Sequence, residues 1–255
     1  MKHTEKWLWL VATLPLLLLV VPIIALMMHA AENGDLWSSL GSESVRTTLL
    51  VSLISSLCAL FITVLFGTPL AWLLARKNFR GKRVINALVD LPLVLPPAVA
   101  GLALLMAFGR NGFLGGIFPD GLAFTSAAVV IAQVFVSAPF YIRSATSGFQ
   151  GVPAELEGVA ATLGAPPQQI FRRITLPLAW PTLVGGAVLC WTRALGEFGA
   201  TIMFAGDMPG ETRTMPIAIY KAMESNLAEA LALSVLLVLS SLLVLLLIQR
   251  VKHAS

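Results

Sequence analysis

The apolar residues of this chain gather in six long stretches that short polar segments separate. A helix rises about 1.5 Å per residue, so about 20 residues cross a hydrocarbon core of about 30 Å. The stretches have about this length and predict six membrane-spanning helices. They cover residues 7–28, 49–75, 91–108, 126–145, 178–204 and 228–248.

The composition agrees with a membrane as the main solvent. Hydrophobic residues make up 57% of the 255 residues, charged residues make up only 12%, and the mean hydropathy is +0.86. Soluble domains are much less apolar. We therefore predict an all-α integral membrane protein whose surface is covered mostly by the lipid bilayer.

The first apolar stretch follows a short basic tip with Lys2 and Lys6, as in a signal peptide. A signal peptide has a shorter apolar region that ends at a small-residue cleavage site. The first stretch is therefore predicted to be a retained span. We divide the chain into this span with its outer segment (1–43), a transmembrane domain (44–249) and a short cytoplasmic tail (250–255).

The basic residues predict the orientation in the membrane. Placing both termini in the cytoplasm leaves, among the lysines and arginines outside the spans, only Arg46, Arg110, Arg213 and Lys221 on the outer side. This distribution follows the positive-inside rule. Because the basic residues are scattered over loops, the pI of 9.4 reflects topology and does not indicate a nucleic-acid partner.

A polar segment, ELEGVAATLGAPPQQIFRRITLP at residues 155–177, separates the fourth and fifth predicted spans. Pro153 suits the first position of a helix, and Gly164 suits the left-handed residue after a last turn. The apolar residues between them recur at helical spacing, and a proline pair then starts a second helix. The apolar face of the first helix consists of Leu156, Val159, Ala160 and Leu163. We predict two short cytoplasmic helices.

Two interpretations of these helices follow from their composition alone. They form either a lid that folds against the bundle or a docking element for a groove on a soluble partner. The spacing favours docking, because the segment resembles the signature loop of ABC-transporter permeases: Glu-Ala-Ala, three residues, Gly, nine residues, Ile-x-Leu-Pro. Ala160, Gly164, Ile174, Leu176 and Pro177 match it in register, whereas Gly158 and Val159 stand at the acid and the middle Ala, with Glu157 as the neighbouring acid.

The resemblance implies that residues 153–177, called the coupling loop from here on, sit in a cleft of a separate nucleotide-binding subunit. The chain itself contains no G-x-x-x-x-G-K-[ST] phosphate loop. We therefore expect no cofactor on this chain, with ATP and magnesium bound by the partner ATPase.

The fifth apolar stretch carries two ionisable residues near its outer end. Arg193 and Glu197 are four residues apart and share a helix face. Ionisable residues inside a span are costly and often mark a pathway, although a pair that only locks two helices together is the alternative. Thr201, one turn further on, is a further candidate for the pathway or gate.

Three phrases, LPLVLPPAVAG at 91–101, RALGEFGATI at 193–202 and PGETRTMP at 209–216, closely resemble molybdate permeases of the ABC class. The resemblance implies a homodimer in the cytoplasmic (inner) membrane of a prokaryote, with two ATPase subunits inside and an extracytoplasmic oxyanion-binding protein outside. Thr212, Arg213 and Thr214 are candidate contacts to that binding protein or within the outer loop. The expected function is ATP-driven import of molybdate and of tungstate.

Other functions stay open at this point. A sulfate or thiosulfate permease is the alternative in the same class, because these oxyanions are alike in shape and charge. An intramembrane enzyme lacks support, since His3, His29 and His253 lie at or beyond the span ends and Cys58 and Cys190 suggest neither a metal site nor a disulfide framework. A membrane scaffold without transport is the remaining alternative. The Gly-rich GRNGFLGG at 109–116 predicts an outer turn.

Overall fold

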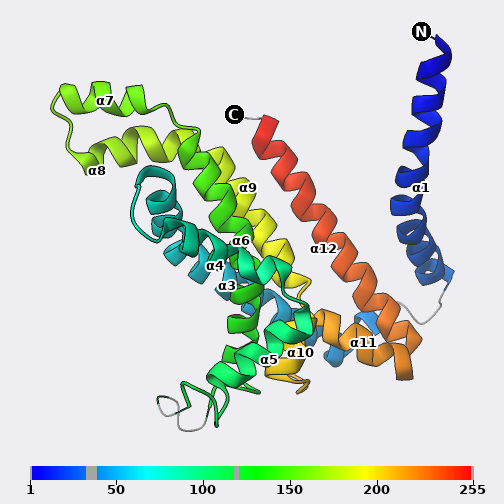
Figure 1. Cartoon of the computed structure of the whole chain (residues 1–255). Coiled ribbons are helices and arrows are strands. Elements are labelled where there is room, and N and C mark those ends of the chain that lie inside the picture. The colour runs from blue at the N-terminus through cyan, green and yellow to red at the C-terminus, as the bar shows by residue number, and fades with distance from the viewer. Residues whose placement is uncertain (1, 33–38, 116, 118–120, 254–255) are drawn as a thin grey trace.

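The computed structural model describes residues 2–32, 39–115, 117 and 121–253, and all regular structure within them is helical. The expected all-α class is thus confirmed (Figure 1). The helices are α1 (Lys2–Glu32), α3 (Glu43–Arg76), α4 (Lys82–Val94), α5 (Pro97–Phe108), α6 (Ser126–Gln150), α7 (Ala154–Thr162), α8 (Pro167–Ile170), the π-helical η1 (Phe171–Thr175), α9 (Leu176–Leu195), α10 (Gly199–Ala205), α11 (Met215–Ser225) and α12 (Leu227–His253).

Several of these helices are long and apolar enough to cross a membrane. Among the described residues there are four: Val11–Glu32, Glu43–Arg76, Ser126–Gln150 and Pro167–Leu195. The bent pair of α4 and α5 would make a fifth span, and the apolar part of α12 within the described residues, Leu227–Leu243, is shorter. A multi-pass membrane protein is confirmed, and six spans stay a prediction.

Helix α6 is the centre of the bundle. It packs most extensively against α3 and α9, and its N-terminal half also packs against α10. Thr125 caps its start by accepting a hydrogen bond from the Ala128 N–H at 3.2 Å. Small residues such as Ala132 and Ala145, which have no exposed surface, let the neighbouring helices approach closely.

Glycines allow α6 and α9 to cross at short distance. A Cβ atom at Gly186 of α9 would lie 2.5 Å from the Ser144 Cβ of α6. On the same crossing, a Cβ atom at Gly148 of α6 would lie 2.9 Å from the Thr182 Cβ of α9. Each helix therefore contributes one glycine where the other presents a side chain, as is common where membrane helices pack closely.

The predicted third span, 91–108, is not one helix. Helix α4 ends at Val94, α5 begins at Pro97, and the two are bent by 118°. Proline lacks an N–H and disfavours helical backbone in the residue before it, and Pro96 and Pro97 follow each other here. The apolar run continues through the break, so hydropathy alone did not reveal the bend.

The predicted fifth span, 178–204, is also interrupted. Helix α9 starts earlier, in direct continuation of α8 and η1, and it ends at Leu195. Gly196 forms the cap, and a separate short helix α10 begins at Gly199. A Cβ atom at Gly199 would lie 2.4 Å from the Pro97 Cβ of α5, so a glycine lets α10 start against the bent third segment.

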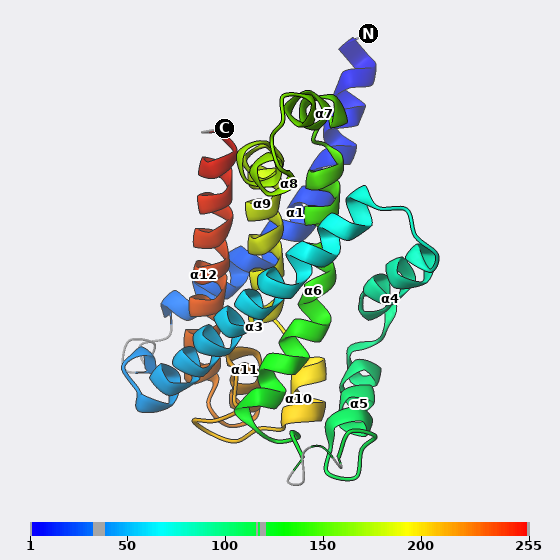
Figure 2. The same cartoon turned by 90° about the vertical axis from the view of Figure 1, so that its left-hand side faces the viewer.

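Helix α1 stands apart from the bundle (Figure 1) and has its main contact with α12. Ala30 of α1 packs there against Ala232 and Val235. Figures 1 and 2 show that the start of α1 and the end of α12 lie at the same end of the bundle as α7 and α8. The opposite end holds α5, α10 and α11.

The glycine crossing gives a test of the packing. Gly186→Ala should destabilise the protein by about 1–3 kcal/mol, because the added methyl group pushes α6 and α9 apart. Gly185→Ala is the matched control, since nothing lies within 4 Å of a Cβ atom at Gly185. Thermal unfolding of the purified protein in detergent measures both variants. Equal unfolding temperatures for the two would contradict this packing.

Candidate functional site

The coupling loop has the predicted local structure. Helix α7 begins after Pro153 and ends at Thr162, and Gly164 is left-handed with φ +85°. Pro167 opens α8, as the second proline-led start predicted. The predicted turn glycine and both helix starts are therefore confirmed.

The carboxylate of Glu157 holds the coupling loop in place. Oε1 of Glu157 accepts hydrogen bonds from Nη2 of Arg76, at 2.9 Å, and from Oγ1 of Thr175, at 2.6 Å. The same Nη2 also donates to the Val152 carbonyl at 3.0 Å. Because Arg76 ends α3 and Thr175 ends η1, Glu157 joins α7 to α3 and to the turn that leads into α9. Charge-assisted hydrogen bonds of this kind are stronger than neutral ones.

Sequence reasoning did not identify Arg76 or Thr175 as part of this loop. In the sequence, Arg76 counts only among the basic residues that predict the orientation in the membrane. Its side chain is 17% exposed and that of Glu157 is 23% exposed, so the pair is largely shielded from solvent. Gly158 and Val159, at the departures from the signature, are exposed instead.

The predicted apolar face of α7 is left uncovered. Leu156 is 48% exposed, Val159 is 60% exposed and Leu163 is 83% exposed, and no residue of α7 is buried. Ala160 is partly buried. The loop therefore does not fold against the bundle as a lid.

The loop continues without a break into the membrane. Helix α8 runs through the π-helical η1 into α9, and Leu176 and Phe171 pack against the core formed by α3, α6 and α9. Ile174 is partly buried and Pro177 is exposed. π-Helical turns are rare and often occur at functional sites.

The Arg193 and Glu197 side chains are brought together, although Glu197 lies beyond the end of α9. Nη1 of Arg193 is 2.7 Å from Oε2 of Glu197. Oε1 of Glu197 accepts a hydrogen bond from the Ala200 N–H at 2.8 Å and so caps the start of α10. The Glu197 side chain is 1% exposed and that of Arg193 is 32% exposed. The pair fixes the corner between α9 and α10, and the guanidinium keeps an open side.

The other predicted outer residues differ in accessibility. Thr201, Thr212 and Thr214 have no exposed surface. Oγ1 of Thr212 accepts a hydrogen bond from the Met208 N–H at 2.9 Å, whereas Oγ1 of Thr201 and Oγ1 of Thr214 have no partner within the described residues. Arg213 forms a two-point ion pair with Asp207, at 2.5 and 3.1 Å, and keeps 26% of its side chain exposed.

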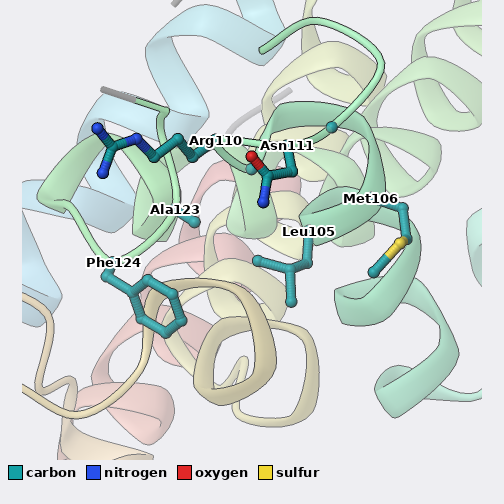
Figure 3. A pocket seen from close by; sticks show the side chains of 8 residues that line it. Leu105, Met106, Arg110, Asn111, Ala123 and Phe124 are labelled. Atoms are coloured by element: carbon teal, nitrogen blue, oxygen red, sulfur yellow. The ribbon is translucent and has the colours of Figure 1, made fainter. Parts of the chain in front are cut away.

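A pocket of about 460 Å³ lies at the same end of the bundle, between the end of α5 and the turn before α6. Figure 3 shows the Arg110 guanidinium extending away from the Leu105 and Met106 side chains that line this pocket. Two backbone N–H groups of the Gly-rich turn bond back to α5: Phe113 donates to the Met106 carbonyl, and Leu114 donates to the Ala107 carbonyl. These bonds agree with the predicted turn.

The described part of the chain contains no group of three His, Cys, Asp or Glu side chains that could hold a metal ion. Cys58 and Cys190 are both free thiols, the first exposed and the second buried.

Curated relatives extend over most of the chain. A molybdenum transport system permease protein ModB of Mycobacterium tuberculosis is 41% identical over 244 residues, which are 94% of this chain and 92% of the relative. ModB of Escherichia coli K12 is 42% identical over 208 residues, 78% of this chain and 90% of the relative. A probable sulfate transport system permease protein, cysT of Chlorokybus atmophyticus, is 35% identical over 227 residues, 87% of this chain and 79% of the relative.

Solved structures share the fold. A chain of a bacterial ABC transporter for alginate import superposes with a TM-score of 0.75 at 18% identity, covering 98% of this chain and 96% of that one. A chain of the MetNI methionine ABC transporter, in an inward-facing conformation, gives a TM-score of 0.59 at 20% identity, covering 92% and 98%. Residues 67–253 match the family described as the binding-protein-dependent transport system inner membrane component. The chain therefore belongs to this family of membrane transport permeases.

Proposed function

We propose that this chain is the membrane permease subunit of an ATP-driven importer for molybdate and tungstate, and that it works as a homodimer. Relatives named as molybdenum permeases, at 41% and 42% identity, support molybdate as the substrate. The relative named as a probable sulfate permease, at 35% identity, keeps sulfate or thiosulfate as the alternative.

The coupling role is supported by the apolar face of α7, which is left uncovered. A short helix that exposes Leu156, Val159 and Leu163 has a groove-binding surface that the described part of the chain leaves uncovered. We assign that surface to one nucleotide-binding ATPase subunit for each copy of this chain. ATP and magnesium belong to that subunit, and this chain binds no cofactor of its own.

The coupling loop can transmit motion because it has two stiff connections. Helix α8 continues through η1 into α9, and Glu157 ties α7 to Arg76 at the end of α3. A displacement of α7 by the ATPase therefore moves α3 and α9 together. We propose that this movement switches the pathway between outward and inward access.

The orientation follows from the same assignment. The coupling loop, the start of α1 and the end of α12 occupy one end of the bundle, which we place in the cytoplasm of a prokaryote, with both termini inside and six spans (Figure 1). The opposite end, with Arg213, then faces an extracytoplasmic binding protein that delivers the oxyanion. Arg213 is the accessible candidate there, while Thr212 and Thr214 are buried and Thr212 holds the outer segment together through the Met208 N–H.

For the pathway we propose Arg193, with Glu197 and Thr201 as supporting residues of an outer gate. A dianion needs a cationic contact that does not trap it. Arg193 meets this need because Glu197 already neutralises it on one side while the other side stays open. Affinity for the oxyanion then resides in the binding protein.

Val159→Asp should greatly weaken capture of the ATPase subunit, by about tenfold or more, since a charge is then forced into an apolar contact. Ala161→Asp places the same charge on an exposed position outside the apolar face and should leave capture unchanged. Copurification of the ATPase with each tagged variant measures the effect. Equal capture by both variants would contradict the assigned surface.

Arg193→Ala should lower transport, but it also leaves the buried Glu197 carboxylate unpaired, at a cost of about 3–5 kcal/mol. The double variant Arg193→Ala/Glu197→Gln removes that cost and keeps an acceptor for the Ala200 N–H. We expect the double variant to recover assembly and thermal stability but not molybdate uptake. Recovery of uptake as well would show that the pair is only a structural lock.

A further inference from the structure

A second ion pair lies in the half of the bundle nearer the coupling loop. Arg143 of α6 faces Asp90 of α4: Nε donates to Oδ1 at 2.6 Å, and Nη2 donates to Oδ2 at 2.5 Å. Asn86 completes the cluster, because its Oδ1 accepts from Nη1 at 2.6 Å and its carbonyl accepts from Nη2 at 2.8 Å. Every nitrogen of the guanidinium thus has an acceptor.

Only part of this cluster lies in a predicted membrane segment: Arg143 belongs to the span 126–145, whereas Asn86 and Asp90 precede the span 91–108. Arg143 lies seven residues before Gln150, the end of α6, which is about 10 Å along the helix axis. Ionisable residues at such a depth are rare and by default mark an ion or substrate pathway. The cluster is also accessible, since the Arg143 side chain is 35% exposed and that of Asp90 is 45% exposed.

The surface that α6 adds around Arg143 has no exposed large apolar side chain, whereas α4, the helix of Asn86 and Asp90, exposes Leu88 and Leu91 at 60% and 47%. Every residue of α6 is described, and its exposed residues are Ser126, Ala127, Ser147 and Gln150. Helix α3, by comparison, exposes Ile54, Phe61 and Phe66 at 60%, 67% and 69%. The stripe of Arg143, Ser147 and Gln150 follows helical spacing toward the coupling end.

A neighbouring helix adds to this stripe. Thr182 of α9 is exposed, and its Cβ lies 2.9 Å from the position of a Cβ atom at Gly148 of α6, the residue that follows Ser147. An exposed arginine followed by hydroxyl and amide side chains forms a route for an anion rather than a surface for acyl chains.

The partner of Arg143 sits on an element that is loosely held. Helix α4 has no buried residue, and its principal packing partner is α6. The bend of 118° after α4 also separates it from α5. In Figure 2, α4 lies at the edge of the bundle, beside α6. Because the partly buried Ile85 and Val89 of α4 pack against the core, the ion pair opens by rotation of the exposed Asp90 side chain and not by movement of α4.

We propose that Arg143 is an oxyanion contact in the cytoplasmic half of the pathway, and that Asp90 occupies it when no ion is passing. A tetrahedral oxyanion presents two oxygens along one edge, as a carboxylate does, so it fits the same fork of N–H donors. Competition from the tethered Asp90 keeps the contact transient and returns the ion to the route toward Ser147. This inference rests on the proposed oxyanion import.

The test uses the complete transporter in proteoliposomes, with its ATPase and its binding protein, and measures uptake of radiolabelled molybdate per assembled complex. Arg143→Gln should lower uptake by about tenfold, the effect of losing one charge-assisted contact. Asp90→Asn breaks the same ion pair but keeps the cation, so its uptake should stay within about threefold of wild type.

Thermal stability of the complex separates the anion contact from a structural link. A structural link between α4 and α6 would lose thermal stability together with uptake, because Arg143 also binds Asn86. An uptake loss in Arg143→Gln that is matched by a loss of thermal stability of the complex, or no uptake loss at all, would overturn the proposal. If Arg143→Gln fails to assemble, Arg143→Lys keeps the charge but not the fork and should still lower uptake per complex. Wild-type uptake by Arg143→Lys would then overturn it. Absence of molybdate uptake by the wild-type complex would instead refute the proposed function itself.

Discussion

The carboxylate of Glu157 is the interaction on which the functional architecture depends. It joins Arg76, at the end of α3, to Thr175 of η1, across 81 and 18 residues of sequence. With α7 held this way, the apolar side chains of that helix point away from the bundle, where a partner can cover them. Without this carboxylate, α7 would lose its ion pair with α3, and the loop would be attached to the core mainly through Phe171.

Two breaks in apolar segments matter as much as the continuous helices. The bend at Pro96 and Pro97 frees α4 from α5, and the cap at Gly196 turns the chain so that Glu197 can bind both Arg193 and the start of α10. A charged pair lies near each break: Asp90 with Arg143 before the bend, and Arg193 with Glu197 at the cap. The bundle around α6 stays closely packed through glycine crossings, so these charged pairs occupy the parts of the fold that have room to move.

Local rules predicted the coupling loop well, because helix starts at proline and a left-handed glycine depend on neighbouring residues only. Hydropathy predicted the membrane helices but missed both breaks, since the apolar run continues through residues 91–108 and 178–204. The pairs of Arg76 with Glu157 and of Arg143 with Asp90 were not predicted, because their partners are 81 and 53 residues apart. An acid directly before LPLVLPP, at Asp90, was the signal available in the sequence for the second pair.

The most direct test of the importer is ATP hydrolysis by the partner ATPase, reconstituted with this chain and the binding protein and titrated separately with molybdate, tungstate and sulfate. We expect stimulation by molybdate and by tungstate at concentrations where sulfate has no effect. Stimulation by sulfate at those concentrations would contradict the substrate assignment. Failure of the chain to assemble with any ATPase would contradict the role of the coupling loop.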